Sequence, residues 1–253
     1  MTQDILYAID GRIATLRFNR PDKKNAITAA MYAALAQGLR DAAHDDAVRV
    51  IVMMGSPGVF TAGNDLEDFL HHPPQGNDSP VLQFMRALRD QPKPVIACVD
   101  GLAIGIGTTL LMHCDLVYAS EQSRFAVPFT QLGVCAEFAS SLLLPQLAGY
   151  HRAADILLTG EFFPVEVAAQ IGLVNRVLPA SELENFVRSK AHALAALPSD
   201  AVRTTKRLMK AAQASLVDVV MQEELTEFTR LLSGPDAKEA FEAFIQKRKP
   251  QFT

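Results

Sequence analysis

The chain has 253 residues, with 24 lysines and arginines against 28 aspartates and glutamates, and a formal net charge of −4 at pH 7. This length is sufficient to bury a full hydrophobic core as one domain with an appendage. The acidic balance argues against a nucleic-acid-binding surface and against a general attraction to anionic membranes.

The ends of the chain and its cysteines indicate a cytoplasmic protein. Residues 1–16 lack the basic and apolar segments of a signal peptide, and no run approaches the roughly 18 apolar residues of a membrane span. The final KPQFT is no recognised peroxisomal address. The three cysteines, Cys98, Cys114 and Cys135, form no CxxC pair and lie in apolar runs. They therefore predict reduced, buried thiols and no zinc site.

Strand-like and helix-like segments alternate in the first half of the chain. The turn at Asp10 and Gly11 predicts a hairpin, Thr28 is a candidate helix cap, and Gly55 ends a buried strand. This order predicts an α/β core. The predicted elements are strands at 5–9 and 13–18, a helix through 31–43, strands at 48–54 and 94–99, a helix over about 105–113 and a strand at 115–120.

Residues 71–78, HHPPQGND, form the most polar and turn-like segment of the chain. We expect an exposed excursion beside the functional site, with solvated histidines rather than metal ligands.

Helical patterns replace strands from about Pro179 onward. We therefore expect a core over residues 1–195 and a helical oligomerisation region over 196–253. Its apolar surface is explained either by subunit packing or by a self-contained helical cap. The helices are predicted at 181–196, 199–213, 215–232 and 235–247, and the third carries a mixed stripe of Leu216, Val219, Val220, Glu223, Leu225 and Phe228.

Two glycine clusters, residues 60–66 (FTAGNDL) and 100–107 (DGLAIGIG), each follow a predicted strand. The second cluster lacks the lysine of a phosphate-binding P-loop and the spacing of a dinucleotide fingerprint. Exposed backbone N–H groups from two such loops can instead stabilise an anion that develops on a carbonyl oxygen.

A lone carboxylate, Glu137, stands among Phe129, Leu132, Val134 and Phe138. An apolar pocket would raise its pKa toward that of a useful general base. The alternative is a surface glutamate in the first turn of a helix, where the helix dipole would lower the pKa instead. Nearby polar residues are expected to serve structure: Asp115 and His113 at a helix–strand junction, and Thr108, Thr109, Ser140 and Ser141 in helix packing.

Several segments, taken together and in this order, resemble the crotonase (enoyl-CoA hydratase/isomerase) superfamily over nearly the whole chain. The resemblance implies an α/β fold with a spiral of ββα repeats, an acyl-CoA thioester substrate, and homotrimers or dimers of trimers built through the C-terminal helices. The segments are NRPDKKNAI at 19–27, FTAGNDL at 60–66, KPVIACVDGLAIGIGTTLLMHCDLVYAS at 93–120, RFAVPFTQLGV at 124–134 and LLTGEFFPVEVAAQIGLVNRVLP at 157–179.

The resemblance also assigns roles to residues. The backbone N–H groups of Asn64 and Ile106 would form the oxyanion hole. Lys23 and Lys24 either meet phosphate charge or are solvated. The implied CoA contacts are Lys24, Asn25, Ala26, Ala62, Gly63, Asn64, Asp65 and Leu66.

One departure from the family pattern decides the expected reaction. The two glutamates that hydratases use to ionise water are replaced by Thr109 and Phe129, which argues against hydration as the main activity. Glu137, eight residues beyond Phe129, resembles the sole acid/base of the peroxisomal-type Δ3,Δ2-enoyl-CoA isomerases. We therefore expect such an isomerase, acting in unsaturated fatty-acid β-oxidation without a metal or redox cofactor. Alternatives are a dienoyl-CoA isomerase, a degenerate hydratase, an acyl-CoA hydrolase and a non-catalytic acyl-CoA-binding protein.

Overall fold

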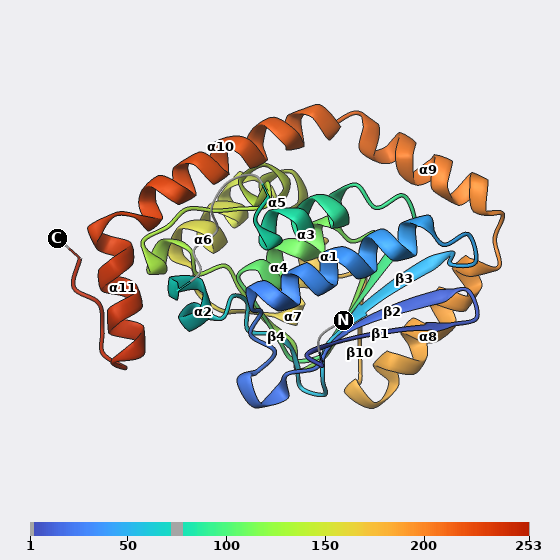
Figure 1. Cartoon of the computed structure of the whole chain (residues 1–253), viewed down its shortest axis with the longest axis horizontal. Helices are drawn as coiled ribbons and strands as arrows, with labels where there is room; N and C mark the ends of the chain where they lie inside the picture. Colours follow the sequence, from blue (N-terminus) through green and yellow to red (C-terminus); the bar gives the residue numbers. More distant parts are fainter. Residues whose placement is uncertain (1–2, 72–77, 253) are drawn as a thin grey trace.

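The computed structural model describes residues 3–71 and 78–252, and Figure 1 shows their arrangement. A six-stranded sheet has the order β1-β2-β3-β5-β7-β10. β1 and β2 form the predicted antiparallel hairpin, and every later neighbour pairs in parallel. The strands are β1 (Ile5–Asp10), β2 (Ile13–Phe18), β3 (Val50–Met54), β5 (Val95–Val99), β7 (Leu116–Ser120) and β10 (Arg176–Leu178).

The central strands are apolar throughout because helices cover both faces of this sheet. Every residue of β3 and of β5 is buried, as expected for parallel strands between two helical layers. Helix α8 (Ala180–Ala195) packs on one face through Leu183, Val187 and Ala191. On the other face, α1 (Ala29–His44) and α3 (Pro80–Arg89) pack on the sheet and on each other.

A second sheet of four short strands follows the order β4-β6-β8-β9. Strands β3, β5 and β7 of the large sheet are each followed in the chain by a strand of the small one, and helical segments come next. This alternation gives the spiral of ββα repeats. The strands are β4 (Val59–Thr61), β6 (Leu102–Ile104), β8 (Arg124–Ala126) and β9 (Phe163–Pro164).

Short helical segments fill the connections between the two sheets. The helix expected over 105–113 is divided into an α-helical turn, α4, and a 3-10 turn, η2. These segments are η1 (Pro21–Lys23), α2 (Leu66–His71), α4 (Ile106–Thr109), η2 (Leu110–His113), η3 (Thr130–Leu132), α5 (Ser140–Ala148), α6 (Tyr150–Thr159) and α7 (Val165–Gln170).

The last three helices form an arc over the molecule, drawn in orange and red in Figure 1. They are α9 (Ser199–Ala211), α10 (Ala214–Leu232) and α11 (Pro235–Ile245). Helix α10 contacts α5, and α11 contacts η3. The C-terminal arc therefore returns to the segment that carries Glu137. The division into units at residues 195 and 196 stays a prediction.

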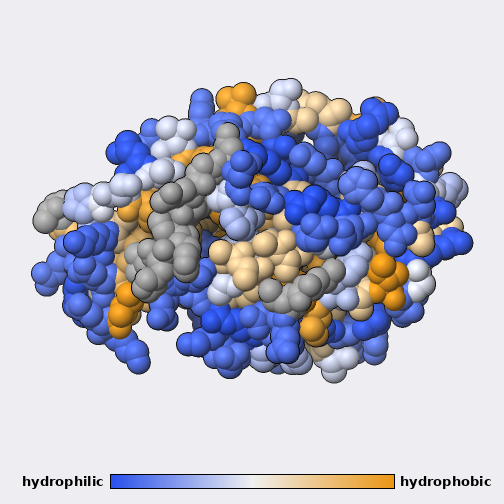
Figure 2. Space-filling model, in the orientation of Figure 1, coloured by the Kyte–Doolittle hydropathy of each residue, from blue (hydrophilic) through white to orange (hydrophobic). Residues whose placement is uncertain are grey.

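Of the mixed stripe expected on α10, Val220, Leu225 and Phe228 are partly buried against the core. The buried residues are Val217, Met221 and Glu224, whereas Leu216 and Val219 are about half exposed, at 48% and 54%. Apolar surface therefore remains on the outer side of the arc, where orange atoms interrupt the mostly blue surface (Figure 2).

The excursion predicted at 71–78 falls mainly on residues 72–77, which lie outside the described part of the chain. Within that part, no helix is long and apolar enough to cross a membrane.

Candidate active site

Glu137 lies in the loop between η3 and α5, and its side chain is buried rather than on the surface. The Thr109 hydroxyl donates a hydrogen bond to Oε1 over 2.5 Å, while Oε2 is buried and has no hydrogen-bond partner among the residues that the structure describes. Burial raises the pKa of Glu137 to about 8; the Thr109 hydrogen bond opposes this rise and the charge of Glu224 adds to it. Since α5 begins at Ser140, Glu137 lies outside the first turn of that helix.

An apolar cavity of about 40 Å³ lies against Glu137. A carboxyl group at such a wall is poorly hydrated, which accounts for its raised pKa. Apart from Glu137 and Glu224, the lining residues are all apolar: Phe69, Val81, Leu82, Met85, Phe138, Met221, Leu225 and Phe228.

The two glycine loops pack directly against each other. Gly63 has a φ of +84°, and a Cβ atom there would lie 2.6 Å from the carbonyl oxygen of Ile104. Likewise, a Cβ atom on Gly107 would lie 2.6 Å from Cγ2 of Thr61. Only glycine permits this approach. Within the described part of the chain, the N–H groups of Asn64 and Ile106 donate no hydrogen bond to the protein, so both are free to bind a ligand oxygen.

Tyr32 on α1 is a site neighbour that the sequence did not suggest. Its hydroxyl donates a short hydrogen bond to Oδ1 of Asn64. Burial, together with the charge of Glu137, raises the pKa of Tyr32 well above its ordinary value. The phenol therefore stays protonated and holds the side chain of Asn64, whose backbone N–H is one of the two free donors.

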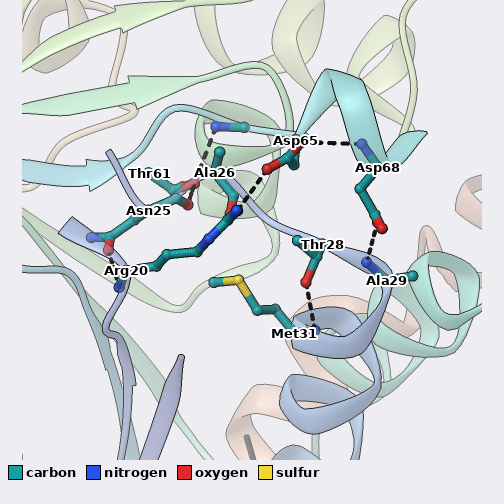
Figure 3. A network of polar contacts seen from close by, with 10 residues as sticks. Arg20, Asn25, Ala26, Thr28, Ala29, Met31, Thr61, Asp65 and Asp68 are labelled. Atoms are coloured by element: carbon teal, nitrogen blue, oxygen red, sulfur yellow. Dashed lines mark hydrogen bonds and ion pairs between the residues drawn. The ribbon is translucent and has the colours of Figure 1, made fainter. Parts of the chain in front are cut away.

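The two segments expected to contact CoA are adjacent in the structure. Ala62 N–H donates to the carbonyl of Lys24 over 3.0 Å, Ile27 N–H donates to Gly63, and Asp65 N–H donates to Ile27. Figure 3 shows the surrounding polar contacts.

Two side chains assigned to CoA binding are used inside the protein. Asn25 is fully buried, and its Nδ2 donates to the carbonyls of Val59 and Phe60. Arg20 donates to Asp65 over 2.6 Å (Figure 3); although burial acts to raise the pKa of Asp65, the Arg20 hydrogen bond brings it below its ordinary value. The side chain of Lys24 is exposed.

The polar residues expected to serve only packing fall into two groups. Asp115 is structural as expected, accepting from Val95 N–H and from Nζ of Lys206. Thr109 is different, since its hydroxyl binds Glu137, and Ser141 binds Glu224 over 2.6 Å. Sequence position alone could not reveal these contacts. Among the described residues, no group of three or more histidines, cysteines and carboxylates is arranged to hold a metal ion.

Residues 8–253 match the family described as enoyl-CoA hydratase/isomerase. The chain belongs to this family, and its crotonase fold is confirmed by solved structures. The structure of Pseudomonas aeruginosa OdaA superposes with a TM-score of 0.94 at 44% sequence identity, covering 96% of this chain and 99% of that one.

Curated relatives differ in the reactions that their names state. Enoyl-CoA delta isomerase 2 of Rattus norvegicus is 34% identical over 99% of this chain, which spans only 65% of that protein's length. The 1,2-epoxyphenylacetyl-CoA isomerase of Escherichia coli strain K12 is 32% identical over 100% of this chain and 99% of its own. The 2,3-dehydroadipyl-CoA hydratase of the same strain is 30% identical over 98% of each. Family membership therefore does not distinguish isomerisation from hydration.

Proposed function

We propose that this protein is a Δ3,Δ2-enoyl-CoA isomerase with Glu137 as its single acid/base. The observation that carries the proposal is the state of this carboxyl group. One oxygen is held by Thr109, the other has no partner within the described part of the chain, and an apolar cavity adjoins the group. A single carboxyl with one free oxygen is suited to moving one proton between two carbons.

In the proposed reaction, the ionised Glu137 removes a proton from C2 of a 3-enoyl-CoA. The electron pair moves onto the thioester carbonyl and gives an enolate. The same carboxyl then returns the proton to C4, and the double bond ends between C2 and C3. No atom is gained or lost. The apolar walls favour this outcome because water would compete for the proton or add to the conjugated product.

The enolate oxygen is assigned to the free N–H groups of Asn64 and Ile106. Two fixed donors aimed at the developing charge stabilise a transition state more than a ground-state carbonyl. The tight packing of Gly63 against Ile104 supports this assignment, because it brings the two donor loops together.

Hydration is the weaker candidate because it requires a second group to ionise water. In this chain the two hydratase positions are Thr109, which is engaged with Glu137, and Phe129, a buried ring whose centroid lies 6.3 Å from that of Phe228. Neither exchanges protons at neutral pH.

Acyl-CoA is proposed to approach along the adjacent segments 24–26 and 62–66. The exposed Lys24 suits a phosphate contact, while the buried Asn25 acts by shaping the backbone of the loop. Exposed apolar residues on α10 and α11 suit a homotrimer or a dimer of trimers, with Phe244 and Ile245 exposed at 62% and 59%. A cytoplasmic role in β-oxidation completes the proposal.

The test is turnover of a trans-3-enoyl-CoA by the wild-type protein and by Glu137→Gln. We expect the wild type to form the conjugated 2-enoyl thioester, followed by its ultraviolet absorbance, without hydrating a 2-enoyl-CoA sample. Glu137→Gln should reduce kcat by at least about 10³-fold while leaving acyl-CoA affinity within about threefold.

Glu121→Gln is a suitable control, since Glu121 is an exposed glutamate in the turn after β7. It should behave as wild type. Rapid hydration by the wild type, or isomerisation that survives in Glu137→Gln, would contradict the proposal.

A further inference from the structure

A second buried carboxylate, Glu224 on α10, is bound to the loop that follows Glu137. Its Oε2 accepts from Ala139 N–H over 2.6 Å. Its Oε1 accepts from Ser141 N–H over 2.9 Å and from the Ser141 hydroxyl over 2.6 Å. These donors are 83 to 85 residues distant in sequence. A carboxylate with three donors is strongly anchored, because charge-assisted hydrogen bonds are the stronger kind.

The anchored loop has an unfavourable backbone conformation. Phe138 and Ala139 are consecutive non-glycine residues with φ values of +58° and +57°. Left-handed backbone is unfavourable for residues that carry a Cβ atom, so it persists only where surrounding contacts impose it. Glu224 supplies such contacts on one side. On the other side, Nε2 of His113 donates to the Phe138 carbonyl over 2.8 Å, and the two rings stack.

This loop also determines the position of Glu137. Both Ser140 N–H and the Ser140 hydroxyl donate to the Glu137 carbonyl, over 3.1 Å and 2.6 Å. Glu224 accepts hydrogen bonds from Ala139 and Ser141, the residues on either side of Ser140. A shift of the loop would therefore move the Glu137 backbone and displace its carboxyl from Thr109 and from the cavity.

We propose that Glu224 is a positioning residue, which holds the left-handed turn at 138–139 and thereby aims the Glu137 carboxyl at the substrate. The inference rests on the proposed function, in which Glu137 moves the proton. Glu224 itself exchanges no proton with the substrate in this scheme. Its charge also contributes to the raised pKa of Glu137.

The experiment compares Glu224→Gln with Glu227→Gln in the full-length protein. Gln keeps the shape of Glu224 but removes its charge and one of its two accepting oxygens. We expect kcat to fall by about 10- to 100-fold, because small misplacements of a reacting group cost this much, with KM changed by less than about threefold. Glu227 lies one turn further along the exposed side of α10 and pairs with Arg230, so Glu227→Gln should retain wild-type kcat.

Two further measurements separate positioning from a general structural role. Hydrogen exchange of the Ala139 and Ser141 amides should accelerate at least about tenfold in folded Glu224→Gln, with other core amides unchanged. The ascending limb of kcat/KM should also move to lower pH, since removing a neighbouring negative charge lowers the pKa of Glu137.

The other titratable groups beside this loop do not change their protonation over the pH range of the ascending limb of kcat/KM. The pKa of His113 is lowered by burial to about 3, and that of Cys135, beside Glu224, is raised by burial to about 11. The pKa of Tyr32 is raised well above 10.0. A limb between about pH 6 and 9 thus reports on the two carboxyl groups.

Failure of the inference differs from failure of the proposed function. If Glu224→Gln keeps kcat, pH profile and amide exchange while Glu137→Gln is inactive, the inference is wrong and the function stands. If Glu137→Gln remains active, the function is wrong. Should Glu224→Gln not fold, Ser141→Ala removes one donor, and the inference then requires about a threefold or larger loss of kcat; an unchanged kcat would overturn it.

Discussion

The hydrogen bond from Thr109 to Glu137 controls how readily the carboxyl releases its proton. By stabilising the ionised form, it restrains the rise in pKa that burial causes, and the outcome is a pKa of about 8. Since proton abstraction needs the ionised form, kcat/KM of the wild type should rise with pH until about pH 8.

We predict that Thr109→Val moves the ascending limb of the kcat/KM–pH profile to higher pH. A rise of about one pH unit in the pKa of Glu137 would lower kcat/KM about tenfold at pH 7 and have little effect above about pH 10. Thr109→Ser, which keeps the hydroxyl, is the control and should retain the wild-type profile. If the ascending limb of kcat/KM lies at the same pH in Thr109→Val as in the wild type, the Thr109 hydroxyl does not lower the pKa of Glu137.

The sequence pattern left Glu137 either in an apolar pocket or on the surface, and its expected role as acid/base came from the family resemblance. It could not find Tyr32 or Glu224. Tyr32 looks like any aromatic residue of an amphipathic helix, and Glu224 like a solvated helix charge. The roles assigned to them depend on long-range contacts: Tyr32 binds a residue 32 positions away in the sequence, and Glu224 binds residues 83 to 85 positions away. Such contacts follow from tertiary packing, which local patterns do not specify.

Between elements, β6 and the loop after β4 approach each other closely beside the proposed site. Gly63 allows this approach through its φ of +84° and its missing Cβ. We predict that Gly63→Ala forces the loops apart, since the new atom would lie 2.6 Å from the Ile104 carbonyl. The Asn64 donor would move with the loop, and kcat should fall at least about tenfold.

Gly58→Ala is a matched control for that change. Gly58 also has a positive φ, +76°, but no atom of the described residues outside its own chain neighbours lies within 4 Å of the position that a Cβ would take, so the substitution adds backbone strain without a clash. It should lower the unfolding midpoint in urea while kcat stays near wild type. Equal loss of kcat in both variants would attribute the effect to strain alone.

Long helices and buried strands were predictable element by element, because their periodicity extends over many residues. The last four predicted helices agree with α8 to α11 to within two residues at each end. The strands of the small sheet were not predicted, since two or three residues carry no measurable period. The buried side of α10 could not be predicted from its pattern, because apolar residues occur on two of its sides and packing selects one.

For the molecule as a whole, two buried groups give opposite pH dependences of stability. The pKa of Glu137 is about 8 in the folded state against an ordinary value of 4.5, so between these values the folded state holds a proton that the unfolded state has lost. The free energy of unfolding therefore falls with rising pH, by up to about 1.4 kcal/mol per unit. The pKa of His113 is about 3 when folded against 6.5, so its contribution rises with pH between these values.

We predict that these contributions nearly cancel from pH 4.5 to 6.5, and that stability declines from pH 6.5 to about 8. In Glu137→Gln the decline should disappear, leaving the variant more stable than wild type at about pH 8 by a few kcal/mol at most. Urea unfolding at half-unit pH intervals measures this difference. Parallel curves for the two proteins would mean that Glu137 titrates near its ordinary pKa.

The path of α10 also affects when the site comes into existence. Met221, Glu224, Leu225 and Phe228 close the cavity beside Glu137, yet they belong to the last 33 residues of the 253-residue sequence. Because domains are synthesised from the N-terminus, the sheets and the glycine loops can form on the ribosome before this wall exists. A nascent chain would thus have the proposed oxyanion donors in place while the Glu137 carboxyl still lacked this wall and was exposed to water. The pocket would then be complete only after α10 has been synthesised.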